Sequence, residues 1–214
     1  IRLQSIKDKK IKNFKKKNYI IPEYNKKILI QEANLFCDWY VKKNLKKKKR
    51  LEFISKFKKI IKYLTLSLKL KNNTFVHRDF HISNLMLVNG KIGVIDSQDA
   101  LIGNQAYDLA SLIDDVRFKT SEPLKNKVYE FYINKQKKLD KDKFKNDFEI
   151  LSILRNLKII GIFTRLAVRD KKKSYLKLIP HSWSLINIRI NKNEIFTELK
   201  ELLNLNFKGK LNGN

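Results

Sequence analysis

The chain has 214 residues, 43% of them hydrophobic, and its 48 basic and 21 acidic residues give a formal charge of +27. This length can fill one substantial hydrophobic core, whereas no apolar run approaches the roughly 20 residues that a membrane-spanning helix needs. The single cysteine excludes an intrachain disulfide framework, and the first residues form no apolar leader, so we expect a cytoplasmic globular protein. Cys37 itself lies on an apolar helical stripe, which predicts a buried thiol rather than a nucleophile.

Two amphipathic helices are predicted before residue 70. Asn25 can cap the first helix, and in both helices the apolar residues recur at helical spacing. The first helix carries Ile28, Leu29, Phe36, Trp39 and Tyr40, and the second carries Ile54, Phe57, Ile61, Leu64 and Leu68.

A polar loop followed by a hairpin is the most informative part of the sequence. Residues 74–76 form a short β-prone run, and residues 77–84 show neither strand alternation nor a helical stripe, which predicts a loop. The apolar runs 85–88 and 91–95 flank Asn89-Gly90, the pair that best predicts a type I′ turn because both positions need φ > 0. Folding this hairpin brings the residue before its first strand beside the residue that ends its second.

Those two residues, Asn84 and Asp96, have the chemistry of a magnesium site. An amide oxygen and a carboxylate are hard oxygen ligands, and water and substrate phosphates supply the others. Asp79, five residues before Asn84, can accept the proton of an attacking hydroxyl. Each residue alone is also an ordinary turn former, but their combined spacing around the hairpin favours a phosphoryl-transfer site.

Three further helices are predicted after the hairpin. Apolar residues at three- and four-residue steps mark segments at about 105–117, about 124–137 and about 148–166. Asp108 lies in the first turn of one of them, where a carboxylate complements the helix dipole. His181-Ser182-Trp183, after Pro180, are expected to lie in a loop. The predicted fold class is mainly α with a β-hairpin (α+β).

The spacing His77-Arg78-Asp79, Asn84, hairpin, Asp96 resembles the catalytic and metal-binding loops of protein-kinase-like enzymes. His81 and the segment 103–112 make the chain more similar to the aminoglycoside phosphotransferase branch of that family. Within the branch it looks most like bacterial kinases that phosphorylate the anomeric hydroxyl of N-acetylmuramate and N-acetylglucosamine. The resemblance extends to residues 21–24 and 155–166, so it spans most of the chain.

The resemblance implies that residues 1–214 form the carboxy-terminal lobe of a kinase-like fold, with the catalytic hairpin at 74–96. It implies ATP and Mg²⁺ as cofactors. Because the residues before His77 predict helices and contain no Gly-rich loop, we expect a fragment that begins near the hinge and lacks the N-terminal ATP lobe. The implied roles are a base for Asp79, magnesium ligation for Asn84 and Asp96, and support of the loop for His77, Arg78 and Asp108.

One position departs from the family pattern. Ser97 stands where the family usually has Phe, so the contact that fixes Asp96 is expected to be smaller or replaced by a hydrogen bond. Four residues are candidate substrate contacts, with ordinary turn or surface roles left open for them: His81, Gln98, Asp99 and Arg165.

The positive charge leaves open a nucleic-acid-binding protein. However, only eight of the 48 basic residues are Arg, and Lys, Ile and Asn, which have A/T-rich codons, are abundant together, so a biased genome composition explains the excess. The aromatic residues also lie mostly on predicted buried stripes, where bases cannot stack on them. We expect neither a specific nucleic acid nor a membrane as a partner, and the intact site residues argue against a degenerate pseudokinase.

The expected function is ATP- and magnesium-dependent phosphorylation of a small-molecule hydroxyl. An amino sugar is the favoured acceptor, with an aminoglycoside, choline or homoserine as alternatives. The sequence leaves open the oligomeric state and the choice between ATP and GTP.

Overall fold

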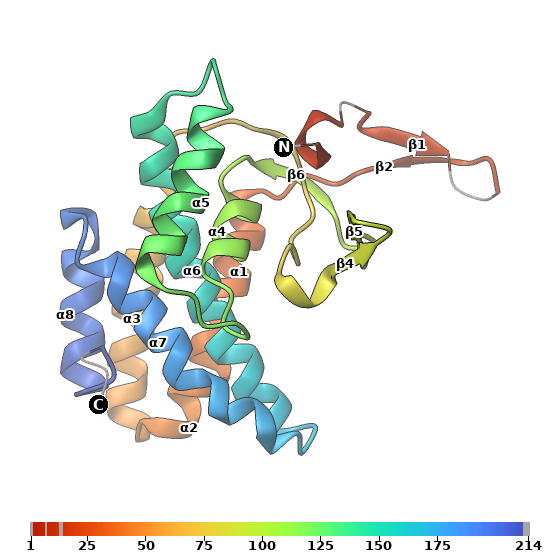
Figure 1. Cartoon of the computed structure of the whole chain (residues 1–214). Helices are drawn as coiled ribbons and strands as arrows, with labels where there is room; N and C mark the ends of the chain where they lie inside the picture. Colours follow the sequence, from red (N-terminus) through yellow and green to blue (C-terminus); the bar gives the residue numbers. More distant parts are fainter. Residues whose placement is uncertain (1, 7, 13–14, 212–214) are drawn as a thin grey trace. The chain divides into compact units, whose positions relative to one another are not determined.

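The computed structural model describes residues 2–6, 8–12 and 15–211 (Figure 1). The chain divides into two compact units, each built from two segments: the first unit holds Ile1–Asn25 and Lys69–Phe148, and the second holds Lys26–Leu68 and Glu149–Asn214. Helices and small antiparallel sheets make up the structure, which agrees with the predicted mainly α, α+β class. Among the described residues, no helix combines the length and hydrophobicity required to cross a membrane.

The described residues of the first unit form three two-stranded antiparallel sheets. They pair β1 (Lys10–Lys12) with β2 (Asn18–Ile20), β3 (Asn72–Val76) with β6 (Leu101–Asn104), and β4 (Leu85–Val88) with β5 (Lys91–Val94). The sequence did not predict the first two pairings. Strands β1 and β2 are exposed at all six positions and β6 is buried at all four, so none of them shows the alternation that identifies a strand.

The β4–β5 hairpin has the predicted geometry. Leu85 pairs with Val94 and Val88 pairs with Lys91, which leaves a two-residue turn. Both turn residues have positive φ, 48° at Asn89 and 71° at Gly90, as a type I′ turn requires.

The first unit also contains helical segments. They are the short 3-10 helices η1 (Leu3–Ser5) and η3 (Ile82–Asn84), the α-helices α4 (Tyr107–Ile113) and α5 (Glu122–Asn134), and the start of α6 (Lys141–Val168). Helix α4 is shorter than predicted because the backbone leaves the helical region at Asp114. Ser121 caps α5 by accepting a hydrogen bond from the Leu124 amide at 3.4 Å.

A single buried carboxylate joins the start of β3 and the end of β6 to α6. Asp147 accepts hydrogen bonds from the Lys69 and Leu70 amides, each at 2.8 Å, and from the Asn104 side-chain amide at 2.6 Å. Asp147 is fully buried, so these donors compensate the cost of removing its charge from water. The contact fixes where β6 ends and therefore where α4 begins.

The second unit is helical. It contains α1 (Lys26–Leu35), the π-helix η2 (Phe36–Val41), α2 (Lys42–Asn44), α3 (Lys47–Leu66), the rest of α6, η4 (Lys173–Leu178), α7 (Ile179–Ile190), η5 (Glu194–Phe196) and α8 (Thr197–Asn206). Figure 1 shows α3 and α8 side by side, and the two helices are in contact. The helix predicted after Asn25 is confirmed as α1 and continues as η2, which carries its predicted aromatic residues. The second predicted helix is confirmed as α3, but it ends at Leu66 and does not include Leu68.

An aromatic core centred on Phe36 holds the second unit together. The Phe36 ring lies 5.3–6.1 Å, centroid to centroid, from the rings of Tyr40, Phe53, Phe57, Trp183 and Phe207. The expectation of a loop at residues 181–183 is therefore wrong. Pro180 stands in the first turn of α7, where a proline is tolerated, and Trp183 is buried in the core.

The prediction for Cys37 is confirmed. The thiol lies buried in η2, and burial raises its pKa to about 12. A thiol that stays protonated in this way is a poor nucleophile.

Candidate active site

The 77–84 loop is anchored at its start by Asp108, the second residue of α4. The two carboxylate oxygens of Asp108 accept hydrogen bonds from the His77 amide at 2.8 Å and the Arg78 amide at 3.1 Å. Arg78 has a positive φ of 71°, and its guanidinium carbon lies 5.4 Å from the centre of the Tyr24 ring. These contacts give Asp108 the geometry of the brace predicted for it.

Ile95 ties the loop to the end of the hairpin. Its amide donates to the Asn84 carbonyl at 3.1 Å, which extends the pairing of β4 and β5 by one step. Its carbonyl lies 3.0 Å from Nε2 of His77, so this histidine nitrogen must donate the hydrogen bond. The imidazole of His77 is fully buried, and it thereby supports the residue that immediately precedes Asp96.

Asn84 and Asp96 lie together, as the hairpin predicted. The Asn84 side-chain amide donates to the Asp79 carbonyl at 2.9 Å and lies 3.5 Å from Oδ2 of Asp96. The other carboxylate oxygen of Asp96 accepts a hydrogen bond from Gln98 at 2.6 Å. Within the described part of the chain, no hydrogen bond occupies Oδ1 of Asn84, so this oxygen is available as a ligand.

Asn84 and Asp96 suit a magnesium ion that takes most of its remaining ligands from water and phosphate. One carboxylate and one amide oxygen are the hard ligands that Mg²⁺ prefers, and Asp96 is exposed, which leaves room for water and phosphate oxygens. The described residues contain no group of three or more His, Cys, Asp or Glu side chains that could enclose a metal. Asn84 and Asp96 would therefore hold such an ion only together with other oxygen ligands.

The main chain of Asp79 organises the loop around this pair. Its carbonyl accepts hydrogen bonds from the His81 amide at 3.0 Å and from the Asn84 side chain at 2.9 Å. Its side chain is half-buried in the same loop. The role of the Asp79 carboxylate as a base stays a prediction, because this role requires a bound acceptor hydroxyl.

The four candidate substrate contacts differ in their surroundings. His81 is buried and its side chain makes no capping bond to η3, while its carbonyl accepts the Asn84 amide at 2.9 Å. Gln98 bonds to Asp96, and the exposed Asp99 offers its carbonyl to Arg78 at 3.2 Å. Arg165 belongs to α6 in the second unit, whereas the other three belong to the first. Their roles toward a substrate remain predictions.

Two pockets of the first unit have a residue of the 77–84 loop in their walls. Phe80 lines a pocket of about 370 Å³, which also contains Arg2, Leu3, Gln4, Asp108, Leu109, Leu112, Val128, Phe131 and Tyr132. Ile82 lines a pocket of about 180 Å³, together with Leu112, Ile113, Asp115, Phe118, Thr120, Leu124, Lys125 and Val128. Both linings are mainly apolar, and each contains one carboxylate.

Asp115 was not singled out by the sequence, although it contacts the 77–84 loop. Its Oδ2 accepts a hydrogen bond from the Ile82 amide at 3.0 Å. The available signal was weak: Asp114-Asp115 is the only pair of adjacent carboxylates in the chain, and it follows an apolar helix.

The chain is similar to known proteins over the region that contains these residues. The model of the phosphotransferase enzyme family matches residues 22–139, which include the 77–84 loop, the hairpin and α4. An N-acetylmuramate/N-acetylglucosamine kinase of Neisseria meningitidis is 35% identical over 167 residues, covering 75% of this chain and 50% of the kinase. A kinase of the same name from Pseudomonas aeruginosa is 32% identical over 190 residues, covering 86% of this chain and 56% of the kinase. The chain thus spans about half the length of the curated relatives it matches.

Proposed function

The chain belongs to the phosphotransferase enzyme family. From this premise we propose that it functions as an ATP- and magnesium-dependent kinase whose acceptor is N-acetylmuramate or N-acetylglucosamine. The observation that carries the proposal is the meeting of Asn84 and Asp96 beside the loop of Asp79. The names of the relatives support the sugar as acceptor. Because ATP is the phosphoryl donor, we place the reaction in the cytoplasm.

The proposed mechanism is an in-line transfer. Asp79 orients the acceptor hydroxyl and takes its proton as the oxygen attacks the γ-phosphorus, which becomes bonded to the acceptor while its bond to the β-γ bridging oxygen breaks. Asn84 and Asp96 would hold Mg²⁺, which supplies positive charge to the β- and γ-phosphates. His77 and Asp108 act through the loop: they keep the Asp79, Asn84 and Asp96 backbones in one arrangement.

The charges around the 77–84 loop favour a neutral or anionic acceptor over a polycationic aminoglycoside. Each ammonium group of such a drug must be paired with a carboxylate when it leaves water. The two pockets walled by Phe80 and Ile82 contain one carboxylate each, Asp108 and Asp115, and both already accept hydrogen bonds from backbone amides. An N-acetylated sugar requires no such pairing.

An acceptor panel tests the proposal. ADP release is measured with ATP and Mg²⁺ from the 214-residue chain and, where the reading frame continues upstream, from the longer product. We expect release with N-acetylmuramate or N-acetylglucosamine, and none with the 1-O-methyl glycoside of N-acetylglucosamine, which lacks the anomeric hydroxyl. Release only with kanamycin, choline or homoserine would overturn the sugar assignment. Absence of release with every acceptor from the full-length enzyme would overturn the kinase assignment.

A further inference from the structure

The contact between Asp115 and Ile82 joins two segments more than 30 residues apart in the first unit. Asp115 lies two residues beyond the end of α4 and is 2% exposed. One carboxylate oxygen accepts the Ile82 amide at 3.0 Å, and the other accepts the Arg117 amide at 2.9 Å. Both oxygens are thus engaged, and the orientation of the carboxylate is fixed.

The Ile82 amide is the first donor of η3, the turn that ends at Asn84. An amide at the start of a helical turn has no acceptor within that turn, and the side chain of the N-cap residue, His81, does not cap it. Without another acceptor, this half-buried amide would have to bond to water. The remote carboxylate of Asp115 supplies the missing acceptor.

Asn84 takes its position from the same turn. Its amide donates to the His81 carbonyl at 2.9 Å, and only Ser83 separates it from Ile82. A shift of the turn at Ile82 therefore moves Asn84, and with it the distance of 3.5 Å between the Asn84 amide nitrogen and Asp96.

We propose that Asp115 is a positioning residue for Asn84. Asp108 holds the start of the 77–84 loop and Asp115 holds its end, so that carboxylates at the two ends of α4 bracket the loop. The consequence for metal binding rests on the proposed function, because it requires Asn84 to be a ligand. The restraint of the turn rests on the contact alone.

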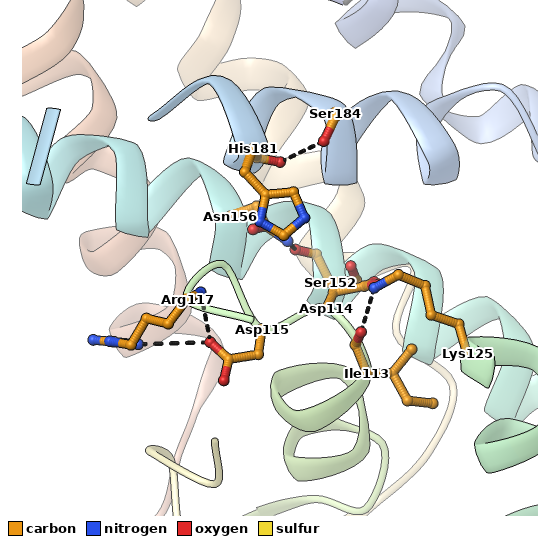
Figure 2. A network of polar contacts seen from close by, with 9 residues as sticks. All are labelled: Ile113, Asp114, Asp115, Arg117, Lys125, Ser152, Asn156, His181 and Ser184. Carbon is orange, nitrogen blue, oxygen red and sulfur yellow. Dashed lines mark hydrogen bonds and ion pairs between the residues drawn. The ribbon is translucent and has the colours of Figure 1, made fainter. Parts of the chain in front are cut away.

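Asp114 offers a matched control. Figure 2 shows Asp115 beside Arg117, while the Lys125 side chain reaches the Ile113 carbonyl. Nζ of Lys125 also lies 3.2 Å from Oδ1 of Asp114, which is fully buried. The two aspartates are adjacent and equally buried, and their described bonds differ: Asp115 accepts the Ile82 amide, whereas Asp114 accepts from the Lys125 ammonium group.

The experiment compares Asp115→Asn with Asp114→Asn in the 214-residue chain. An asparagine keeps the volume of the side chain, but it replaces one of the two carboxylate oxygens by an NH2 group. One of the Ile82 and Arg117 amides, which now bond to different oxygens, then faces a donor instead of an acceptor. Hydrogen exchange of the Ile82 and Asn84 amides is read by NMR, and Mn²⁺ affinity is read from the loss of the free-ion EPR signal. Thermal unfolding of both variants corrects for global destabilisation.

We expect Asp115→Asn to accelerate exchange at Ile82 and Asn84 by about tenfold or more over Asp114→Asn, and to weaken Mn²⁺ binding by about 10–100-fold, as loss of a partner behind a metal ligand usually does. Amide exchange equal to that of Asp114→Asn would overturn the proposal, and equal Mn²⁺ affinity would overturn its consequence for the metal site. If Asp115→Asn does not fold, the wild-type Ile82 amide decides: protection supports the bond, and exchange at the rate of an open chain refutes it.

A second pair of variants tests the bond from the donor side. Ile82→Pro removes the amide hydrogen, and its neighbour His81 already has the extended backbone that a residue before proline requires, with φ −131° and ψ 167°. In the Ile82→Pro background, Asp115→Asn should cause no further loss of Mn²⁺ affinity. A loss as large as in the wild-type background would show that Asp115 acts through another contact and would overturn the proposal.

The Asp96→Ala variant separates this proposal from the proposed function. If Asp96→Ala binds Mn²⁺ as tightly as the wild type, the metal site and the proposed function fail. The exchange of the Ile82 amide then still decides whether Asp115 holds the turn.

Discussion

Asp96 combines a strained backbone with a fixed side chain. Its φ of 69° lies in the left-handed region, which costs a non-glycine residue about 1–2 kcal/mol. The carboxylate that this conformation presents is held by Gln98 at 2.6 Å, two residues along the chain. This hydrogen bond comes from Gln98, so the expectation that Ser97 replaces the family's Phe by a hydrogen bond stays a prediction.

Asp79→Asn in the full-length enzyme tests the base. An asparagine keeps the backbone carbonyl that Asn84 and His81 use, so the loop should retain its shape. Turnover should fall by about 10²–10⁴-fold, the usual contribution of a positioned base, while nucleotide affinity stays within about twofold. Steady-state ADP release together with nucleotide titration measures both, and near-normal turnover would remove Asp79 from this role.

A comparison of Asp96→Ala with Asp99→Ala tests the metal ligand. The first change removes a carboxylate that faces Asn84, whereas the second leaves intact the Asp99 carbonyl that binds Arg78. Calorimetric titration of ATP with and without Mg²⁺ should show that Asp96→Ala loses the magnesium dependence of binding and that Asp99→Ala retains it. The reverse ranking would move the ligand three residues along the chain.

The junction of α1 and η2 depends on a glycine of α6 in the second unit. A Cβ atom added at Gly161 would lie 2.6 Å from the Phe36 amide nitrogen and closer still to the Leu35 carbonyl group. Real Cβ atoms do not approach backbone this closely, so α6 meets α1 where only a glycine fits. No local sequence signal indicates this contact, because Gly161 is one residue of a long apolar helix pattern.

Gly161→Ala should therefore destabilise the protein. Alanine is a better helix former than glycine by about 1 kcal/mol, but the overlap with α1 should outweigh this gain and leave a net loss of about 1–3 kcal/mol. Urea unfolding should show a lower midpoint with an unchanged slope. Gly93→Ala is the control, since the nearest atom to a new Cβ there is 3.8 Å away, and an equal midpoint in the two variants would contradict the close approach.

Across the whole chain, the sequence predicted what local signals determine. The Asn89-Gly90 turn, the loop before it and the helices that carry apolar stripes all depend on neighbouring residues. The pairing of β3 with β6, the anchoring at Asp147 and the contact of Asp115 with Ile82 depend on residues about 30 to 80 positions apart. A buried aspartate and one at a surface turn look alike in sequence, so only the fold distinguishes Asp115 from an ordinary helix end.

The distribution of lysine supports a compositional origin of the charge of +27. Helix α3 begins with Lys47, Lys48, Lys49 and Arg50, and its first turn contains no acidic residue. Positive charge at a helix N-terminus opposes the helix dipole, so these residues do not stabilise the helix they begin. Another exposed lysine run, residues 171–173, follows α6 and lies far from α3 in the sequence, so the positive charge is not confined to one segment.

Binding to nucleic acid should therefore be weak, indifferent to sequence and sensitive to salt. Affinity for two unrelated DNA duplexes, measured by fluorescence anisotropy, should be about 10⁻⁴–10⁻⁶ M at physiological salt and should fall steeply between about 50 and 200 mM. Replacing Lys47, Lys48 and Lys49 by Gln should weaken binding about as much as the same change at residues 171–173. Each lost phosphate contact lowers the slope of log affinity against log salt concentration by about 1, wherever the lysine lies. Tight, sequence-selective binding that survives 200 mM salt and is lost only with the α3 variant would instead identify a dedicated nucleic-acid site.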